Sequence, residues 1–253
     1  MVIYIGTSGY LYNFWKDSFY PINLPKGEYL QYYSNHFNTV EINNTFYKSP
    51  TKEIINNWYN STPNDFKFSI KVNMYITHYK KLKNINKPLK EFINLIKNLK
   101  NKLGCLLFQF HHNFKFTITN FKRLKKLKNI IPPNIKCAFE FRDNSWYNDT
   151  VYDFFSNITN WTIAIIYIQF GKNLEYGFNP KSIINNNNFF YFRLHGSNGQ
   201  YIGSHDLKIL NQIKKIIKNK NAYIYFNNTD SISNDNIPDA VKDAQRMTKI
   251  IKK

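Results

Sequence analysis

Short apolar runs that favour strands alternate along the chain with stretches in which apolar residues recur at helical spacing. Eight runs rich in β-branched and aromatic residues are predicted strands: residues 2–6, 39–43, 66–71, 105–110, 136–142, 162–167, 189–195 and 222–228. Seven stretches are predicted helices: residues 27–37, 51–60, 86–103, 117–130, 149–157, 205–219 and 236–252. A weaker helical pattern covers residues 171–186.

This order of elements predicts the fold class. Eight strands that alternate with helices within 253 residues are typical of a TIM (β/α)8 barrel. No linker, internal repeat or change of composition divides the sequence, so we expect a single domain over residues 1–253. An open, doubly wound sheet is the alternative, because the spacing of strands along a chain does not show whether the sheet closes.

Most of the predicted strands end in polar residues, although strands covered by helices should be apolar throughout. The polar residues at the strand ends are Glu41, Asn43, Lys71, Gln109, Glu140, Arg142, Arg193, His195, Asn227 and Asn228. The two-residue repeat of a strand places Glu140 with Arg142 on one face, and Arg193 with His195 on another. A charge in a dry interior is stable only if it is paired or faces water. Because all strand ends of a barrel meet at one edge, we predict a polar pocket there.

The residue types at this edge indicate acid-base chemistry on an anionic ligand. Glu140 and His195 are the first candidates for catalysis, with Glu41 and His78 beside them. The candidate substrate-binding residues are Asn43, Lys71, Gln109, Arg142, Arg193, Asn227, Asn228, Tyr47, Trp146 and Tyr201. The three aromatic residues come from predicted loops and either stack on a ligand or hold those loops in place. The alternative for the charged residues is a structural ion-pair network.

The chain contains about twice as many basic residues as acidic ones, 35 Lys and Arg against 16 Asp and Glu. The formal net charge is +19, which favours an anionic partner such as DNA or RNA. The chain is also rich in Asn, Ile, Tyr and Phe, residues that AT-rich codons supply, so nucleotide drift is a competing explanation. The two cysteines lie inside predicted strands, and the sequence has neither a membrane-length apolar run nor a signal-peptide pattern. We therefore expect a cytoplasmic protein without a membrane partner, its oligomeric state left open.

No local motif calls for a metal or a cofactor. His-Glu-x-x-His, Cys-x-x-Cys and acidic calcium loops are all missing from the sequence. A dispersed metal site is conceivable at the barrel edge from Glu41, His78, Glu140, His195 and Asp230. Three cationic residues at the same edge favour an anion there instead, so we expect no cofactor.

The motifs as a set resemble the domain of unknown function family 72, also called YecE-like. They include "IGTSGY" at 5–10, "VEINNTFYKSP" at 40–50, "FKFSIKVNMYITH" at 66–78, "FEFRDNSW" at 139–146, "FRLHG" at 192–196 and "YFNNTD" at 225–230. The family is similar to TIM barrels of the endonuclease IV and sugar isomerase kind. The resemblance implies that these residues occupy motif positions: Glu41, Asn43, Thr45, Phe46, Tyr47, Lys71, Thr77, His78, Gln109, Glu140, Arg142, Trp146, Arg193, His195, Gly196, Asn227 and Asn228.

Three functions stay open at this point. The first is a barrel enzyme, such as a hydrolase, that acts on a phosphate-bearing substrate of the nucleic-acid kind. The second is a nucleic-acid binding protein without chemistry, and the third is an enzyme for a small sugar or a phosphorylated metabolite.

The sequence departs from the family pattern at Tyr10, at His111 and His112, and in extra residues near Asp230.

Overall fold

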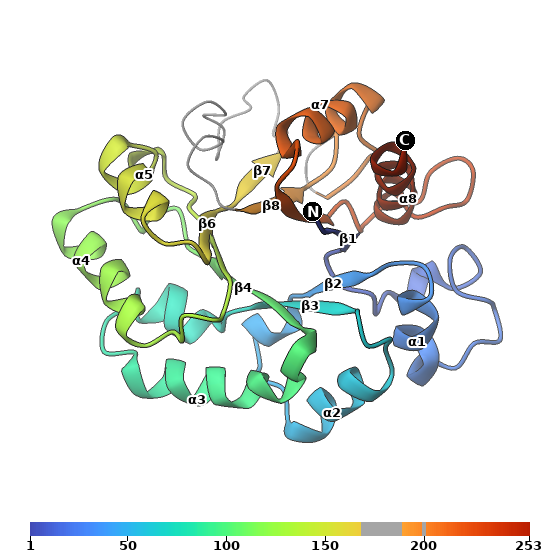
Figure 1. The fold of residues 1–253 in the computed structure, drawn as a ribbon. Helices are drawn as coiled ribbons and strands as arrows, with labels where there is room; N and C mark the ends of the chain where they lie inside the picture. The colour runs from blue at the N-terminus through green and yellow to red at the C-terminus, as the bar shows by residue number, and fades with distance from the viewer. Residues whose placement is uncertain (168–188, 199–200) are drawn as a thin grey trace.

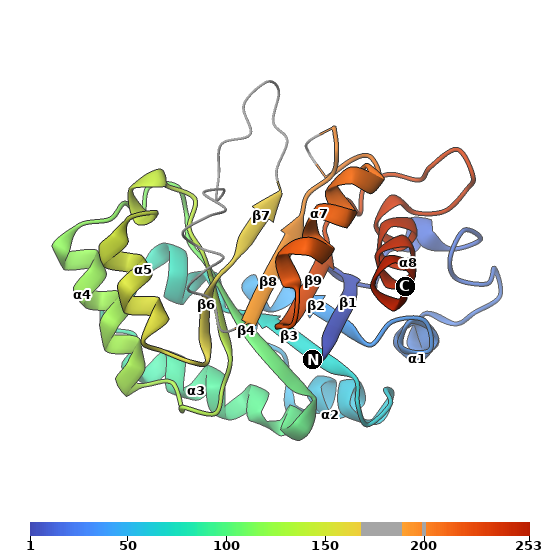
Figure 2. The same cartoon turned by 45° about the horizontal axis from the view of Figure 1, so that its top comes forward.

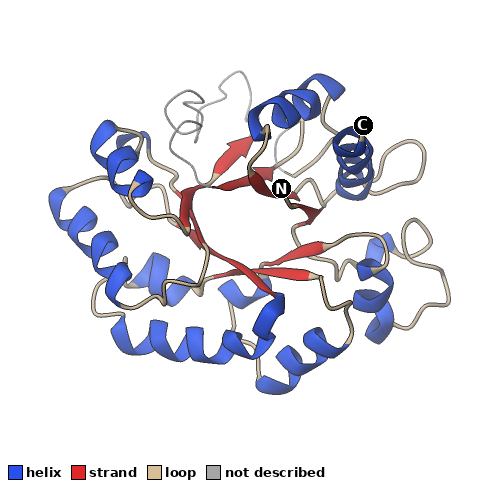
Figure 3. Cartoon of the chain, in the orientation of Figure 1, coloured by secondary structure: helices blue, strands red, loops and turns tan. Residues whose placement is uncertain are grey.

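The fold is a mixed α/β structure in which parallel strands face one another and helices lie outside them (Figure 1, Figure 3). The computed structural model describes residues 1–167, 189–198 and 201–253. The strands within these ranges are β1 (Ile3–Thr7), β2 (Thr39–Ile42), β3 (Lys67–Lys71), β4 (Leu103–Gln109), β5 (Cys137–Glu140), β6 (Trp161–Ile163), β7 (Ile165–Tyr167), β8 (Phe189–Leu194) and β9 (Asn221–Phe226). All eight predicted strands are therefore present, with ends displaced by one to two residues in most cases.

The α-helices follow the predicted positions as well. They are α1 (Tyr29–Ser34), α2 (Lys52–Asn60), α3 (Asn86–Ile96), α4 (Ile118–Lys126), α5 (Asp149–Ser156), α7 (Leu207–Ile217) and α8 (Asp239–Lys252). Two predicted helices are shorter than expected because their last turns tighten into the 3-10 segments η5 (Lys97–Lys102) and η6 (Leu127–Asn129). The predicted helix at 236–252 begins only after Pro238, whose extended backbone precedes the first turn. The weak helical pattern at 171–186 lies outside the described residues.

The strands form two parallel sheets. Their orders are β1-β9-β8-β7 and β2-β3-β4-β5-β6. The predicted strand at 162–167 divides at Ala164, where the chain passes from one sheet to the other. Ala164 N donates to Phe139 O at 2.9 Å, so the chain keeps contact with β5 as it crosses. Figure 2 shows β6 and β7 following one another along this crossing.

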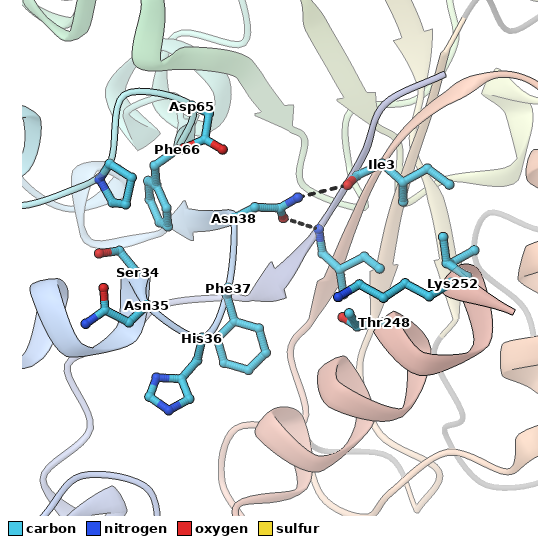
Figure 4. A pocket seen from close by; sticks show the side chains of 13 residues that line it. Ile3, Ser34, Asn35, His36, Phe37, Asn38, Asp65, Phe66, Thr248 and Lys252 are labelled. Carbon is cyan, nitrogen blue, oxygen red and sulfur yellow. Dashed lines mark hydrogen bonds between the residues drawn. The ribbon is translucent and has the colours of Figure 1, made fainter.

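Side chains join the sheets on the other side, between β1 and β2, where the ladder is reduced to a single bridge of Ser8 and Glu41. Asn38 donates to Ile3 O at 3.0 Å and accepts from Ile5 N at 2.9 Å (Figure 4). The hollow of about 520 Å³ around Asn38 lies at the amino ends of these strands, away from the polar strand ends. A Cβ at Gly6 would lie 2.0 Å from Thr39 O, so only glycine permits this close approach.

The core has two parts, one on each side of the strands. The larger part packs the outer strand faces against the helices, as in α7, whose buried residues are Leu210, Ile213 and Ile217. The smaller part fills the space between the sheets with Cys105, Leu107, Ala138, Ala164, Phe189, Tyr191, Tyr223 and Tyr225. Within the described residues, no helix is both long and apolar enough to span a bilayer.

Candidate functional site

Except for Asn228, the polar residues at the strand ends lie on the interior face of the sheets, directly above the smaller core. Strand alternation puts Arg193 two residues after Tyr191, and Gln109 two residues after Leu107, on that face. Because all the strands are parallel, their carboxyl ends lie at one edge, which we call the mouth. Strand alternation and the parallel direction of the strands thus place the predicted site residues on one face and at one edge of the sheets.

Arg193 is the centre of the site and is 1% exposed. Its Nε lies 3.0 Å from Glu41 Oε2, its Nη2 lies 2.8 Å from Glu41 Oε1, and its Nη1 lies 2.5 Å from Glu140 Oε2. Both carboxylates are completely buried. One guanidinium from β8 therefore binds carboxylates from β2 and β5, which belong to the other sheet. The pair of acidic residues predicted for catalysis is held in an ion-pair cluster.

Further donors complete the partners of the two carboxylates. Glu41 accepts from Ser8 Oγ at 2.8 Å and from Tyr191 Oη at 2.7 Å, and Glu140 accepts from Arg142 Nε at 3.0 Å. Burial alone would raise the pKa of Glu140, but the charges of Arg193 and Arg142 outweigh it and hold this pKa well below its usual range. Glu140 is therefore ionised at neutral pH and does not supply a proton as a general acid.

Arg142 and Lys71 differ from Arg193 because they face the open side of the mouth. The Arg142 side chain is 32% exposed, and Nε is its one nitrogen with a bond to a described residue. Lys71 is half-buried, and its Nζ lies 4.1 Å from the centroid of the Phe46 ring. Burial, followed by the charge of Arg193, lowers the pKa of Lys71 to about 7. A ligand in the mouth would meet the positive charge of Arg142 and the partly protonated amine of Lys71.

His195 lies below the opening and is 1% exposed. Asn227 Nδ2 donates to its Nδ1 at 2.7 Å, which leaves the ring proton on Nε2. Burial, reinforced by Arg193, lowers the pKa of His195 well below its usual range, so the ring is neutral at pH 7. Nε2 is buried without a hydrogen-bond partner among the described residues. The Tyr201 ring stands edge-on to the imidazole with centroids 5.4 Å apart.

His78 lies on a single π-helical turn, η4 (Tyr75–Tyr79), that follows β3. Its Nδ1 is 2.9 Å from Thr77 Oγ1, and its ring packs edge-on to Phe46 at 4.8 Å and His111 at 5.7 Å. Burial, followed by the charge of Lys71, lowers the pKa of His78 to about 4. His78 is thus a neutral neighbour of Phe46 and does not line the opening.

The mouth contains a cleft of about 250 Å³. Its lining residues are Tyr12, Asn43, Tyr47, Lys71, Gln109, Arg142, Arg193, Tyr201, Asn227, Thr229 and Asp230. Asn43 Oδ1 and Gln109 Oε1 are buried acceptors that have no hydrogen-bond partner among the described residues. A cleft that combines two cations with two unsatisfied acceptors suits a ligand with both an anionic group and hydroxyl donors.

Two predicted substrate-binding residues lie elsewhere. Trp146 is completely buried, stacks on Phe141 with centroids 4.4 Å apart, and donates its indole N–H to Phe114 O. Asn228 Nδ2 donates to Gly203 O and to Asp243 Oδ2, each at 3.0 Å, so its side chain ties the end of β9 to α8. Strand alternation explains the second case, because Asn228 points away from the face that Asn227 occupies.

The dispersed metal site is not assembled either. Among the residues that the structure describes, no three His, Cys, Asp or Glu side chains lie close enough together to hold an ion. Glu41 and Glu140 are occupied by Arg193, whereas Asp230 lines the cleft from the other sheet and accepts from Thr229 Oγ1 at 3.1 Å.

Four residues of the site are not among the predicted site residues. Tyr191 and Ser8 bind Glu41, and Tyr12 and Thr229 line the cleft. Tyr191 shares a strand face with Arg193, and this two-residue spacing is the signal that would have found it. Ser8 and Tyr12 come from the first loop, where no strand period indicates which way a side chain points.

Comparisons with known proteins agree with this architecture. A family model described as "Protein of unknown function DUF72" matches residues 4–253. UPF0759 protein YunF of Bacillus subtilis (strain 168) is 30% identical over 158 residues, which cover 60% of this chain and 55% of YunF. UPF0759 protein YecE of Escherichia coli (strain K12) is 32% identical over 85 residues, 34% of this chain and 31% of YecE. The matches thus span about half of YunF and about a third of YecE.

Solved structures extend the likeness over the whole chain. A DUF72 family protein from Thermotoga maritima MSB8 has a TM-score of 0.83 and 27% identity and covers 100% of both chains. D-psicose 3-epimerase from Clostridium cellulolyticum H10 has a TM-score of 0.58, and AP endonuclease, family 2, from Brucella melitensis has one of 0.56. They cover 100% and 91% of this chain, and 98% and 95% of their own. At 8% identity, these two enzymes resemble the chain in fold alone.

Proposed function

Since the chain belongs to the DUF72 family, a family described as being of unknown function, we propose that it is an enzyme that binds a small phosphate-bearing, hydroxyl-rich substrate in the mouth cleft. In this proposal the two parallel sheets act as one TIM barrel, with the site where such barrels carry their chemistry. The observation that carries the proposal is that the three cationic side chains have different partners. Arg193 binds both buried carboxylates, Arg142 uses only its Nε on Glu140, and Lys71 has no ion pair with a described residue, so Arg142 and Lys71 can face a ligand.

The cleft has two chemically different sides that match such a substrate. Arg142 and Lys71 supply positive charge from the ends of β5 and β3, and an arginine fork suits a phosphate group. Asp230 and Thr229 approach from the end of β9, and the free acceptor of Asn43 lies in the same cleft. A volume of about 250 Å³ suits a sugar phosphate rather than a folded polymer.

The acid-base roles follow from the protonation states. Glu140 stays ionised beside two arginines and holds Arg142 in place, which makes it a positioning residue. Neutral His195 and Asn227 lie beneath Tyr201, and Nε2 of His195 is a proton donor without a partner among the described residues. Asp230 lines the cleft, and its carboxylate is not bound by an arginine. We therefore assign to Asp230 the transfer of protons to and from the substrate.

The test is a thermal-shift and binding series on the whole protein. We expect sugar phosphates to raise the melting temperature, the same sugars without phosphate to have no such effect, and Arg142→Met to abolish the shift. A ligand at 100 times its Kd would stabilise the protein by about 2.7 kcal/mol. Arg123→Met on α4 is the matched control, because it removes an arginine outside the cleft. Equal shifts from phosphorylated and unphosphorylated sugars would contradict the proposal.

A nucleic-acid partner is the second candidate, because a separate basic hollow favours it. This hollow of about 490 Å³ is lined by Lys83, Lys87, Arg123 and Lys126, with no acidic residue in its lining. It lies between the start of α3 and α4, and the net charge of +19 adds to the attraction. Here Arg123→Met should weaken oligonucleotide binding and reduce its salt dependence, while Arg142→Met should not.

We also propose a cytoplasmic location, which the two buried free thiols support.

A further inference from the structure

Lys71 occupies an unusual place for a charged side chain. It is the last residue of β3, shares the interior strand face with Ser69, and lines the mouth cleft. Its amine has no hydrogen bond or ion pair with a described residue, and Nζ lies 4.1 Å from the centroid of the Phe46 ring. An amine that lines a cleft without a counter-ion is free to approach a ligand.

The lack of a counter-ion has a structural cause. Glu41 and Glu140 both act on Lys71 electrostatically, but each is already bound by Arg193. The other charged groups that act on the amine are Arg193 and Arg142, and both disfavour a further positive charge. Phe46 of the 3-10 turn η3 (Asn44–Phe46) and His78 on η4 lie near it and carry no negative charge, and Asp230 lines the same cleft from the end of β9. Arg193 thus binds the two carboxylates that could otherwise pair with Lys71 and keep its amine protonated.

The protonation state agrees with this geometry. Burial is the largest cause, and the charge of Arg193 the next, of a pKa of about 7 for Lys71. A substantial fraction of the Lys71 amines is therefore neutral at pH 7, whereas an ordinary lysine is neutral in roughly one molecule in 2,500. A desolvated lysine beside another cation is a recognised way to make an amine nucleophilic.

We propose that Lys71 is the nucleophile of the mouth cleft and that its substrate is a phosphate-bearing aldehyde or ketone. This inference rests on the proposed function, because Arg142 must hold the phosphate while Lys71 reaches the carbonyl carbon. The lone pair of Nζ attacks that carbon, and a proton passes from nitrogen to the carbonyl oxygen to give a carbinolamine. Loss of water then leaves a C=N bond between substrate and Lys71, with no oxidant or reductant consumed. Asn43 Oδ1 and Gln109 Oε1 are the free acceptors for the hydroxyl groups.

The experiment traps the imine. The protein is incubated with glyceraldehyde 3-phosphate, reduced with borohydride, digested and examined by peptide mass spectrometry, and glyceraldehyde is the phosphate-free control. We expect Lys71 to be labelled roughly tenfold or more faster than the average lysine, with a half-maximal rate near pH 7. Arg142→Met should slow labelling by the phosphorylated aldehyde more than labelling by glyceraldehyde, so that the preference for the phosphorylated aldehyde is lost. Lys71→Met should remove the labelled peptide.

The outcomes separate this inference from the proposed function. If sugar phosphates still bind but Lys71 is labelled no faster than surface lysines, the nucleophile is wrong and the proposed function stands. If Lys71 reacts fast with both aldehydes and Arg142→Met changes neither rate, the phosphate part of both proposals is wrong. Labelling of wild-type protein does not depend on whether a variant folds, so the first comparison is decisive alone.

Discussion

Replacing Arg193 with methionine tests whether one guanidinium stabilises both buried carboxylates. Methionine keeps much of the side-chain length but leaves Glu41 and Glu140 without their shared cation, while Glu140 retains the bond from Arg142. Breaking a buried ion pair by removing one partner costs about 3–5 kcal/mol, because the charge left behind stays desolvated. For a chain of this length, such a loss lowers the melting temperature by roughly 6 to 20 °C.

The dependence on pH separates this mechanism from a simple packing defect. The pKa of Glu140 is depressed in the folded protein, so its stabilisation is complete above the unfolded value of 4.5 and is lost as pH falls through the folded value. Without Arg193, burial dominates and the pKa of Glu140 rises, so this carboxylate takes up a proton at a higher pH than in the wild type. We therefore expect the difference in unfolding free energy between wild type and variant to be largest at pH 7 and to shrink toward pH 4.

Urea unfolding, followed by circular dichroism at several pH values, measures both quantities. Arg142→Met is the control, because its side chain is about one third exposed and makes one bond to Glu140. An ion pair so placed contributes roughly 0–1 kcal/mol. If Arg193→Met costs no more than Arg142→Met, or if its cost is the same at pH 4 and pH 7, then Arg193 does not stabilise the two carboxylates as described.

Two further predictions concern the seam between β1 and β2 and the layer beneath the ions. Gly6→Ala places a Cβ about 2.0 Å from Thr39 O, so we expect it to lower stability in urea unfolding by several kcal/mol, whereas Gly27→Ala has open space and should not destabilise. A stable Gly6→Ala protein would refute the close approach of the strands. Tyr225→Phe removes a hydroxyl that lies 2.7 Å from both Thr39 Oγ1 and Ser69 Oγ. Thr39 keeps its bond to Lys67 O, but Ser69 Oγ loses its partner, and an unpaired buried hydroxyl costs about 1–3 kcal/mol. A loss below that range in thermal unfolding would mean that the Ser69 hydroxyl finds another partner.

The sequence could predict the elements and the face on which each site residue lies. Strand and helix patterns are local, and the strand repeat of two places Arg193 and His195 on one face without reference to the rest of the chain. The same rule could have assigned Tyr191 to that face and Asn228 to the opposite one. The direction of the Trp146 side chain could not be predicted in this way, because Trp146 lies on a short 3-10 turn (Asn144–Trp146) outside the strands and its direction is set by packing.

The tertiary structure alone decided which charges bind one another. Glu41 and Arg193 are separated by 152 residues and lie in different sheets, so no local pattern relates them. The sequence supplies two carboxylates, two arginines and a lysine at the strand ends, and these permit several pairings. Electrostatic energy depends on distance and burial, and both are set only when the sheets come together. Their assembly gives both carboxylates to Arg193 and leaves Lys71 without an acidic partner.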